Sequence, residues 1–298
     1  DLAGALRAAG RTREATRVQQ AILVQLDSSG YTDTDLYRPV LSFLASAMAE
    51  LGEFRALDSI AGAYLRGLDA TYGKGAADGR IATIYGLNKL RMGDIDSAAL
   101  WLVAAARDTS ETSRLVTAGW LPPARMQLLL EQGKLAEARK AAASLARDTP
   151  TRRVTQAWLR ACLRRAEGDP AGARVLLDSA LAAESAAGKP APYLVYALLT
   201  AAEWRLHDGD FHAADSLARV VIDAAGLDSL ALVRSAHVGR AELVRARAAA
   251  AGGDSTAALG AARRAATALT NGFGAANRQT VAASGLRDSL EARLARSR

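Results

Sequence analysis

Apolar residues recur along the chain at helical spacing, in blocks that short polar turns separate. Within a block they stand three or four positions apart, as in Ala98, Leu102 and Ala105, and this spacing places them on one side of an α-helix. Alanine and leucine are strong helix formers, whereas the β-branched and aromatic residues that strands favour are sparse here. The pattern predicts an all-α protein.

A turn containing glycine recurs between these blocks at intervals of 35 to 44 residues. The seven glycines are Gly10, Gly52, Gly93, Gly133, Gly168, Gly209 and Gly253. The residue five positions after the glycine is alanine in six of the seven cases, and the residue seven positions before it is small in six of seven. These two columns predict pairs of antiparallel helices in close contact, with glycine ending the first helix in the left-handed conformation. Four aspartates are expected to cap the second helix: Asp94, Asp169, Asp210 and Asp254.

The predicted helix pairs are 1–9 and 12–27, 38–51 and 54–71, 79–92 and 95–109, 120–132 and 135–148, 152–167 and 170–187, 191–208 and 211–225, and 229–251 and 254–271. The corresponding repeat units are 1–30, 38–73, 79–112, 119–150, 152–188, 191–226 and 229–272, with a capping helix at 275–296, and they form one domain, 1–298. Every proline is placed outside a helix interior, and Pro122-Pro123 makes the fourth unit start irregularly. The short first helix indicates that the sequence is the C-terminal part of a longer protein.

The small residue, the Gly-Asp turn, the apolar residue after it and the following alanine together resemble the tetratricopeptide repeat. The unit length is similar to that of the long, kinesin-light-chain-like variety, and the loops at Tyr72-Gly73 and Phe273-Gly274 resemble its inter-repeat loops. The family's large aromatic residue early in the first helix is missing from most units. The resemblance implies a right-handed solenoid of about seven helix pairs and a role in holding a protein or peptide.

Composition narrows the class of protein without identifying the partner. The formal net charge is +7, which favours acidic partners in general, and the alanine- and arginine-rich usage is typical of a GC-rich bacterial genome. Cys162 is the single cysteine, so an intrachain disulfide is excluded. No apolar run reaches the ~20 residues that span a bilayer. The compartment stays open, with the cytoplasm slightly favoured, and so does the oligomeric state.

Three segments carry residue types that could support chemistry. Gly73-Lys74-Gly75 lacks the preceding glycine and the Ser or Thr of a phosphate-binding loop, and is interpreted as an inter-repeat loop. His207 and His212 stand on either side of a turn, where they do not share a helix face. Cys162 has no base next to it in sequence that could accept its proton. We therefore expect no catalytic residue, no metal and no cofactor, and predict that the chain is not an enzyme.

In this repeat family the first helices of the pairs line the concave groove. Counting from each glycine, the predicted partner-binding groove contains Arg80, Arg91, Trp120, Gln127, Trp158, Arg165, Tyr196, Glu203, Arg240 and Arg247, with Cys162 among them. Interleaved arginine and aromatic residues are typical of surfaces that recognise peptides or acidic groups. The alternative, that these arginines only solvate helix surfaces, stays open. Nucleic acid is not favoured, because the Arg-Arg pairs are dispersed over three units.

The prediction from sequence is a non-catalytic scaffold that binds a protein or peptide, with an acidic one favoured. An alternative is a ligand-sensing regulatory arm of a kinase or transcription-regulator domain that precedes this chain. An enzyme with its chemistry in the groove is a third hypothesis, opposed by the lack of matched catalytic residues.

Overall fold

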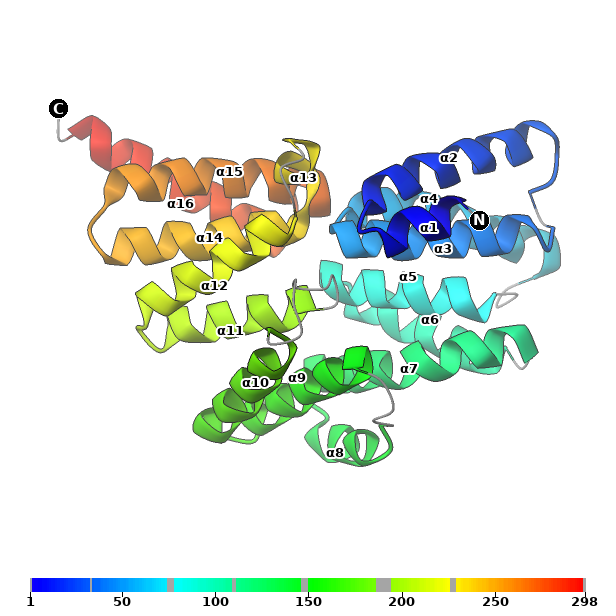
Figure 1. The fold of residues 1–298 in the computed structure, drawn as a ribbon, viewed down its shortest axis with the longest axis horizontal. Coiled ribbons are helices and arrows are strands. Elements are labelled where there is room, and N and C mark those ends of the chain that lie inside the picture. Colours follow the sequence, from blue (N-terminus) through cyan, green and yellow to red (C-terminus); the bar gives the residue numbers. More distant parts are fainter. Residues whose placement is uncertain are drawn as a thin grey trace. The chain divides into compact units, whose positions relative to one another are not determined.

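The computed structural model describes residues 2–32, 34–73, 78–108, 111–145, 150–185, 194–225 and 229–296. Their regular structure is helical throughout, with no strand in these ranges, and within each unit every helix packs against at least one of its neighbours in the chain (Figure 1). The all-α prediction is confirmed. Among the described residues no helix is long and apolar enough to cross a membrane.

The chain divides into two compact units, residues 1–134 and 135–298. The first unit contains α1 (Leu2–Ala8), α2 (Thr12–Ser28), α3 (Tyr37–Leu51), α4 (Phe54–Tyr72), α5 (Gly79–Met92), α6 (Ile95–Arg107) and α7 (Glu111–Glu131). The second contains α8 (Leu135–Ala143), α9 (Pro150–Ala166), α10 (Pro170–Ser185), α11 (Val195–His207), α12 (Phe211–Ala224), α13 (Ser229–Arg234), α14 (Ala236–Ala251), α15 (Ser255–Phe273) and α16 (Arg278–Arg296). The boundary lies in the turn at Gly133, so the helices of the fourth predicted pair belong to different units.

The seven glycine turns share one geometry, which was predicted from their spacing. Every one of these glycines has a positive φ, between 70° and 91°, which costs glycine little because it has no Cβ. At each turn the glycine N–H donates to the carbonyl three residues back, and the next N–H donates to the carbonyl five residues before it. At Gly52, for example, these acceptors are the carbonyl oxygens of Ala49 and Met48, at 3.2 and 2.9 Å. This is the Schellman arrangement, which satisfies the last carbonyls of the first helix.

The four predicted aspartate caps are all present at the start of the second helices. Asp254, for example, accepts a hydrogen bond from the backbone N–H of Ala257 at 2.9 Å, and the other three accept from the N–H three residues on, at 2.8 to 3.2 Å. These bonds satisfy backbone donors that a helix N-terminus leaves open.

The two small-residue columns line the contact between the paired helices. Every member of the column after the glycine has no exposed surface, and every member of the column before it is buried. At Gly86 the approach is especially close, since a Cβ there would lie 2.9 Å from side-chain atoms of Leu102 on α6. Burial of these columns agrees with close packing of the residues around each of these turns.

Three predicted helix boundaries are wrong. Helix α8 ends at Ala143 instead of residue 148. Helix α7 begins at Glu111 instead of residue 120, and it contains Pro122 and Pro123 in its interior. The proline pair removes two backbone donors, but Ala124 and Met126 directly after it are fully buried, and this packing holds the helix through the prolines. The helix predicted at 229–251 is two helices, because Ser235 is extended and its hydroxyl accepts from the N–H of Val238 at 3.4 Å, starting α14.

Candidate partner-binding face

Three first helices of the second unit, α9, α11 and α14, pack side by side, α9 on α11 and α11 on α14. A row of rings crosses them, which we call the aromatic row: Trp158, Tyr196 and His237. The Trp158 and Tyr196 rings are stacked, with centroids 5.8 Å apart and an angle of 27°. His237, which is buried, meets Tyr196 edge to face at 5.0 Å. These separations lie in the range of favourable aromatic pairs.

The indole of Trp158 is fixed as well as stacked. Its N–H donates to the hydroxyl of Thr200 on α11 at 2.9 Å, so the polar atom of a half-buried ring has its partner. A ring held in one orientation loses little further freedom when it contacts a ligand. Trp158 is therefore a preorganised apolar contact between α9 and α11.

Ion pairs accompany the aromatic row, formed by residues three to twelve positions after the rings in the sequence. Arg240 on α14 donates to Glu203 on α11 through Nε at 3.1 Å and Nη2 at 2.7 Å. Arg165 on α9 donates to Asp208 at 3.2 Å, and its guanidinium lies 4.9 Å from the ring centroid of Trp204. One ion pair therefore joins α14 to α11 and another joins α9 to the end of α11, beside the aromatic row.

These pairs change the expected character of the face. The sequence predicts arginines open to solvent, but the side chain of Arg240 is 18% exposed and that of its partner Glu203 is 39% exposed. Arg165 is likewise half-buried, and its Nη1 is covered and makes no hydrogen bond within the described residues. Arg247 is exposed, and no ion pair engages it in the described part of the unit. The carboxylates are therefore at least as accessible to a partner as the paired guanidiniums.

Five predicted groove residues are brought together here, namely Trp158, Arg165, Tyr196, Glu203 and Arg240. Cys162 lies on α9 between Trp158 and Arg165 and is half-buried. Thr200, Trp204, Asp208 and His237 complete the set and were not predicted as groove residues. His237 follows Tyr196 at nearly the repeat length, a spacing that could have revealed it.

Of the five other predicted residues, Arg247 lies on α14 and four lie in the first unit. Arg80 pairs with Asp78, Nη2 to Oδ2, at 3.3 Å, and the Arg91 guanidinium lies 5.6 Å from the Phe54 ring centroid. Trp120 is 53% exposed on α7, and Gln127 is half-buried on the same helix. No contact comparable to the aromatic row joins these four in the described part of that unit.

The three segments with candidate chemistry are only partly covered by the described residues. Within the described ranges no group of three or more His, Cys, Asp and Glu side chains could hold a metal ion. Asp210 lies between the two histidines in sequence. It caps α12 by accepting a hydrogen bond from the N–H of Ala213 at 3.2 Å, in keeping with its predicted role as a helix cap. Of the loop at Gly73-Lys74-Gly75, residues 74–77 lie outside the described residues.

Comparisons with protein-family models, with curated proteins and with solved structures return no match for this chain. The resemblance to the tetratricopeptide repeat therefore stays a prediction, and a function can be inferred only from the geometry of the helices and their side chains.

Proposed function

We propose that this chain is a non-catalytic scaffold of tetratricopeptide-type helix pairs, and that its second unit binds a protein or peptide on the face formed by α9, α11 and α14. The repeat assignment is supported by seven turns of one geometry and by the buried small-residue columns around them. Repeats of this kind bury their core between neighbouring helices and leave one face of the first helices for partners.

The observation that carries the proposal is the aromatic row with its fixed indole. Contacts that matter most in protein interfaces are aromatic and arginine side chains held in place before binding. Trp158 and Tyr196 are both half-buried and stacked, and the Trp158 indole is hydrogen-bonded to α11, so the two rings offer contact area with little ordering cost.

The ion pairs indicate how such a partner would be selected. Glu203 and Asp208 each retain lone pairs beyond the bonds they make to Arg240 and Arg165. A peptide that crosses the aromatic row would therefore meet acceptors as well as the free guanidinium of Arg247. We propose a partner with mixed polar groups and an apolar anchor, instead of a uniformly acidic one.

The test begins with peptides selected from a random displayed library against the chain, followed by fluorescence anisotropy with the best binder. Replacing Trp158 by alanine should weaken that binder by more than ~1 kcal/mol, or about five-fold in Kd. The control is Val175→Ala, an exposed apolar position on α10 of the same unit, which should leave Kd unchanged. Circular dichroism checks that both variants keep their helices. If both variants bind like the parent, the partner does not use this face.

A further inference from the structure

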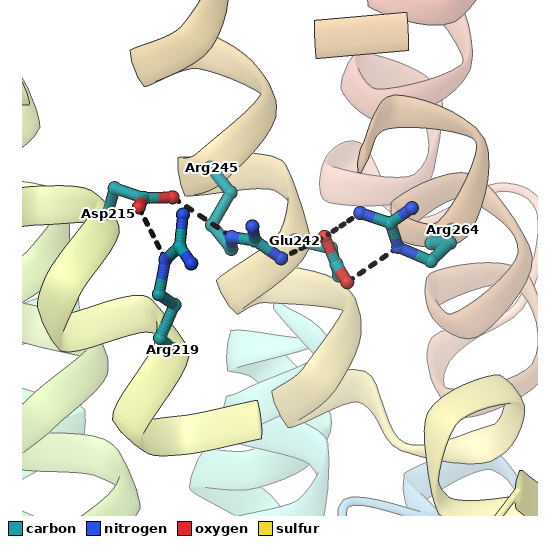
Figure 2. A network of polar contacts seen from close by, with 5 residues as sticks. All are labelled: Asp215, Arg219, Glu242, Arg245 and Arg264. Carbon is teal, nitrogen blue, oxygen red and sulfur yellow. Dashed lines mark hydrogen bonds and ion pairs between the residues drawn. The ribbon is translucent and has the colours of Figure 1, made fainter. Parts of the chain in front are cut away.

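A network of five charged side chains crosses α12, α14 and α15 (Figure 2). On α14 it lies on a different side from the aromatic row, because Glu242 and Arg245 follow His237, the α14 ring of that row, by five and eight residues, about 140° and 80° around the helix. The remaining members are Asp215 and Arg219 on α12 and Arg264 on α15. The network is therefore a second surface feature of this unit.

Alternating charges hold the network together. Asp215 accepts from Arg219 Nε at 2.6 Å and from Arg245 Nε at 2.9 Å. Glu242 accepts from Arg264 at 2.7 and 3.0 Å, through Nε and Nη2, and from Arg245 Nη1 at 3.5 Å. Burial raises the pKa of Asp215, but the hydrogen bonds from Arg219 and Arg245 outweigh this effect and lower the pKa below its usual value. Asp215 thus stays charged and keeps both arginines in position.

The two outer arginines are exposed, Glu242 lies beneath them, and Arg245 and Asp215 between them are 23% and 28% exposed. The Arg219 and Arg264 side chains are 61% and 52% exposed, whereas that of Glu242 is 4% exposed. Arg219 uses only Nε in the network, so the edge formed by Nη1 and Nη2 is unused within the described residues. That edge fits a carboxylate with two parallel hydrogen bonds. Three arginines over two carboxylates also leave one excess positive charge.

We propose that Arg219, Arg245 and Arg264 form a recognition surface for an extended acidic protein segment that carries carboxylates on alternate residues. Three neighbouring helices at 8–10 Å spacing place the backbones of the outer arginines at most roughly 16–20 Å apart. In an extended chain, side chains on one face recur about every 7 Å, so three or four alternate residues cover that span. The net charge of +7 favours the approach of such a segment. This surface is independent of the α9–α11–α14 face, and either can fail without the other.

The experiment measures binding of a synthetic peptide in which five glutamates alternate with five serines, by calorimetry at low and moderate salt. Arg219→Gln should lower the affinity about three- to five-fold, which is the scale of an exposed ion pair. This variant is expected to fold, because Asp215 keeps Arg245 as a partner. Arg219→Lys should recover part of the affinity, since it restores the charge without the fork. Arg174→Gln, an exposed arginine on α10, is the matched control and should bind like the parent.

Two further probes separate this proposal from general charge attraction. A peptide of the same composition with its glutamates in one block should bind more weakly than the alternating one. Equal binding of the two peptides, or an equal loss in Arg174→Gln, would overturn the proposal, because net charge alone would then account for the affinity. Tighter binding of a short DNA duplex that Arg219→Gln abolishes would overturn it in favour of nucleic acid.

Discussion

Replacing Gly239 by alanine tests a close contact between α14 and α15 in the second unit. A Cβ at this position would lie 2.7 Å from Cγ and 2.9 Å from the backbone N of Leu269 on α15. A side chain can rotate away from such a contact, but a backbone atom moves only if the helix moves. Inserting one carbon into a filled core costs about 1–3 kcal/mol, while glycine to alanine in a helix gains about 0.5–1 kcal/mol. The net expectation is a loss of roughly 1 kcal/mol.

Gly285→Ala is the matched substitution, since Gly285 lies inside α16 with no atom within 4 Å of an added Cβ. It should gain the same helix propensity without the clash, a stabilisation of about 0.5–1 kcal/mol. The difference between the two variants therefore isolates the overpacking term of about 1–3 kcal/mol.

Urea titration followed by the helical circular-dichroism signal measures both variants against the parent. Because repeat chains can unfold in parts, the midpoints and the slopes are compared together. The reasoning fails if Gly239→Ala raises the midpoint as much as Gly285→Ala does, because α14 and α15 could not then approach as closely as described.

Two further predictions concern local interactions. Asp210→Ala removes the oxygen that accepts from the N–H of Ala213 at 3.2 Å, and should lower the free energy of unfolding by about 1 kcal/mol in the same titration; an unchanged midpoint would mean that water satisfies this donor equally well. Burial and then the charge of Asp27 raise the pKa of Tyr37 to about 12, so its contribution to stability is present below pH ~10 and is lost as the pH rises toward 12. Thermal unfolding across this range should therefore show a steeper loss for the parent than for Tyr37→Phe, and identical profiles would contradict the assigned cause.

The turns could be predicted from sequence because each is local and is repeated. Each turn depends on a few neighbouring positions: a left-handed glycine, two buried residues that are mostly small and, in four turns, a capping aspartate such as Asp254. Because the glycine and the two columns recur at seven turns, the pattern can be distinguished from chance. The interior prolines of α7 could not be predicted in the same way, since the burial of Ala124 and Met126 is a tertiary effect that outweighs the local proline penalty. Serine is a common helix-capping residue, so Ser235 could have suggested a new helix. The apolar pattern continues through this position, however, and it predicted one continuous helix.

The candidate face was predictable in some of its members but not in its chemistry. Counting from the glycines selected Trp158 and Tyr196, because residues on equivalent helices recur with the repeat. It did not show that Arg165 binds Asp208. Asp208 stands beside a turn, where the role of an aspartate in ending a helix is a sufficient explanation. Which carboxylate an arginine reaches depends on the side-chain conformations and spacing of two helices, and neither is encoded in a periodic pattern.

The hydrogen bonds of the glycine turns join residues only three and five apart, which bears on how the chain folds. Loops this short close rapidly and with little entropic cost, and chains dominated by local contacts tend to fold fast. A helix pair can therefore begin to form as soon as its own turn has been synthesised, before distant segments exist. It becomes stable only when the next pair covers its apolar side. Order in each unit can then spread outward from several starting points instead of waiting for one nucleus.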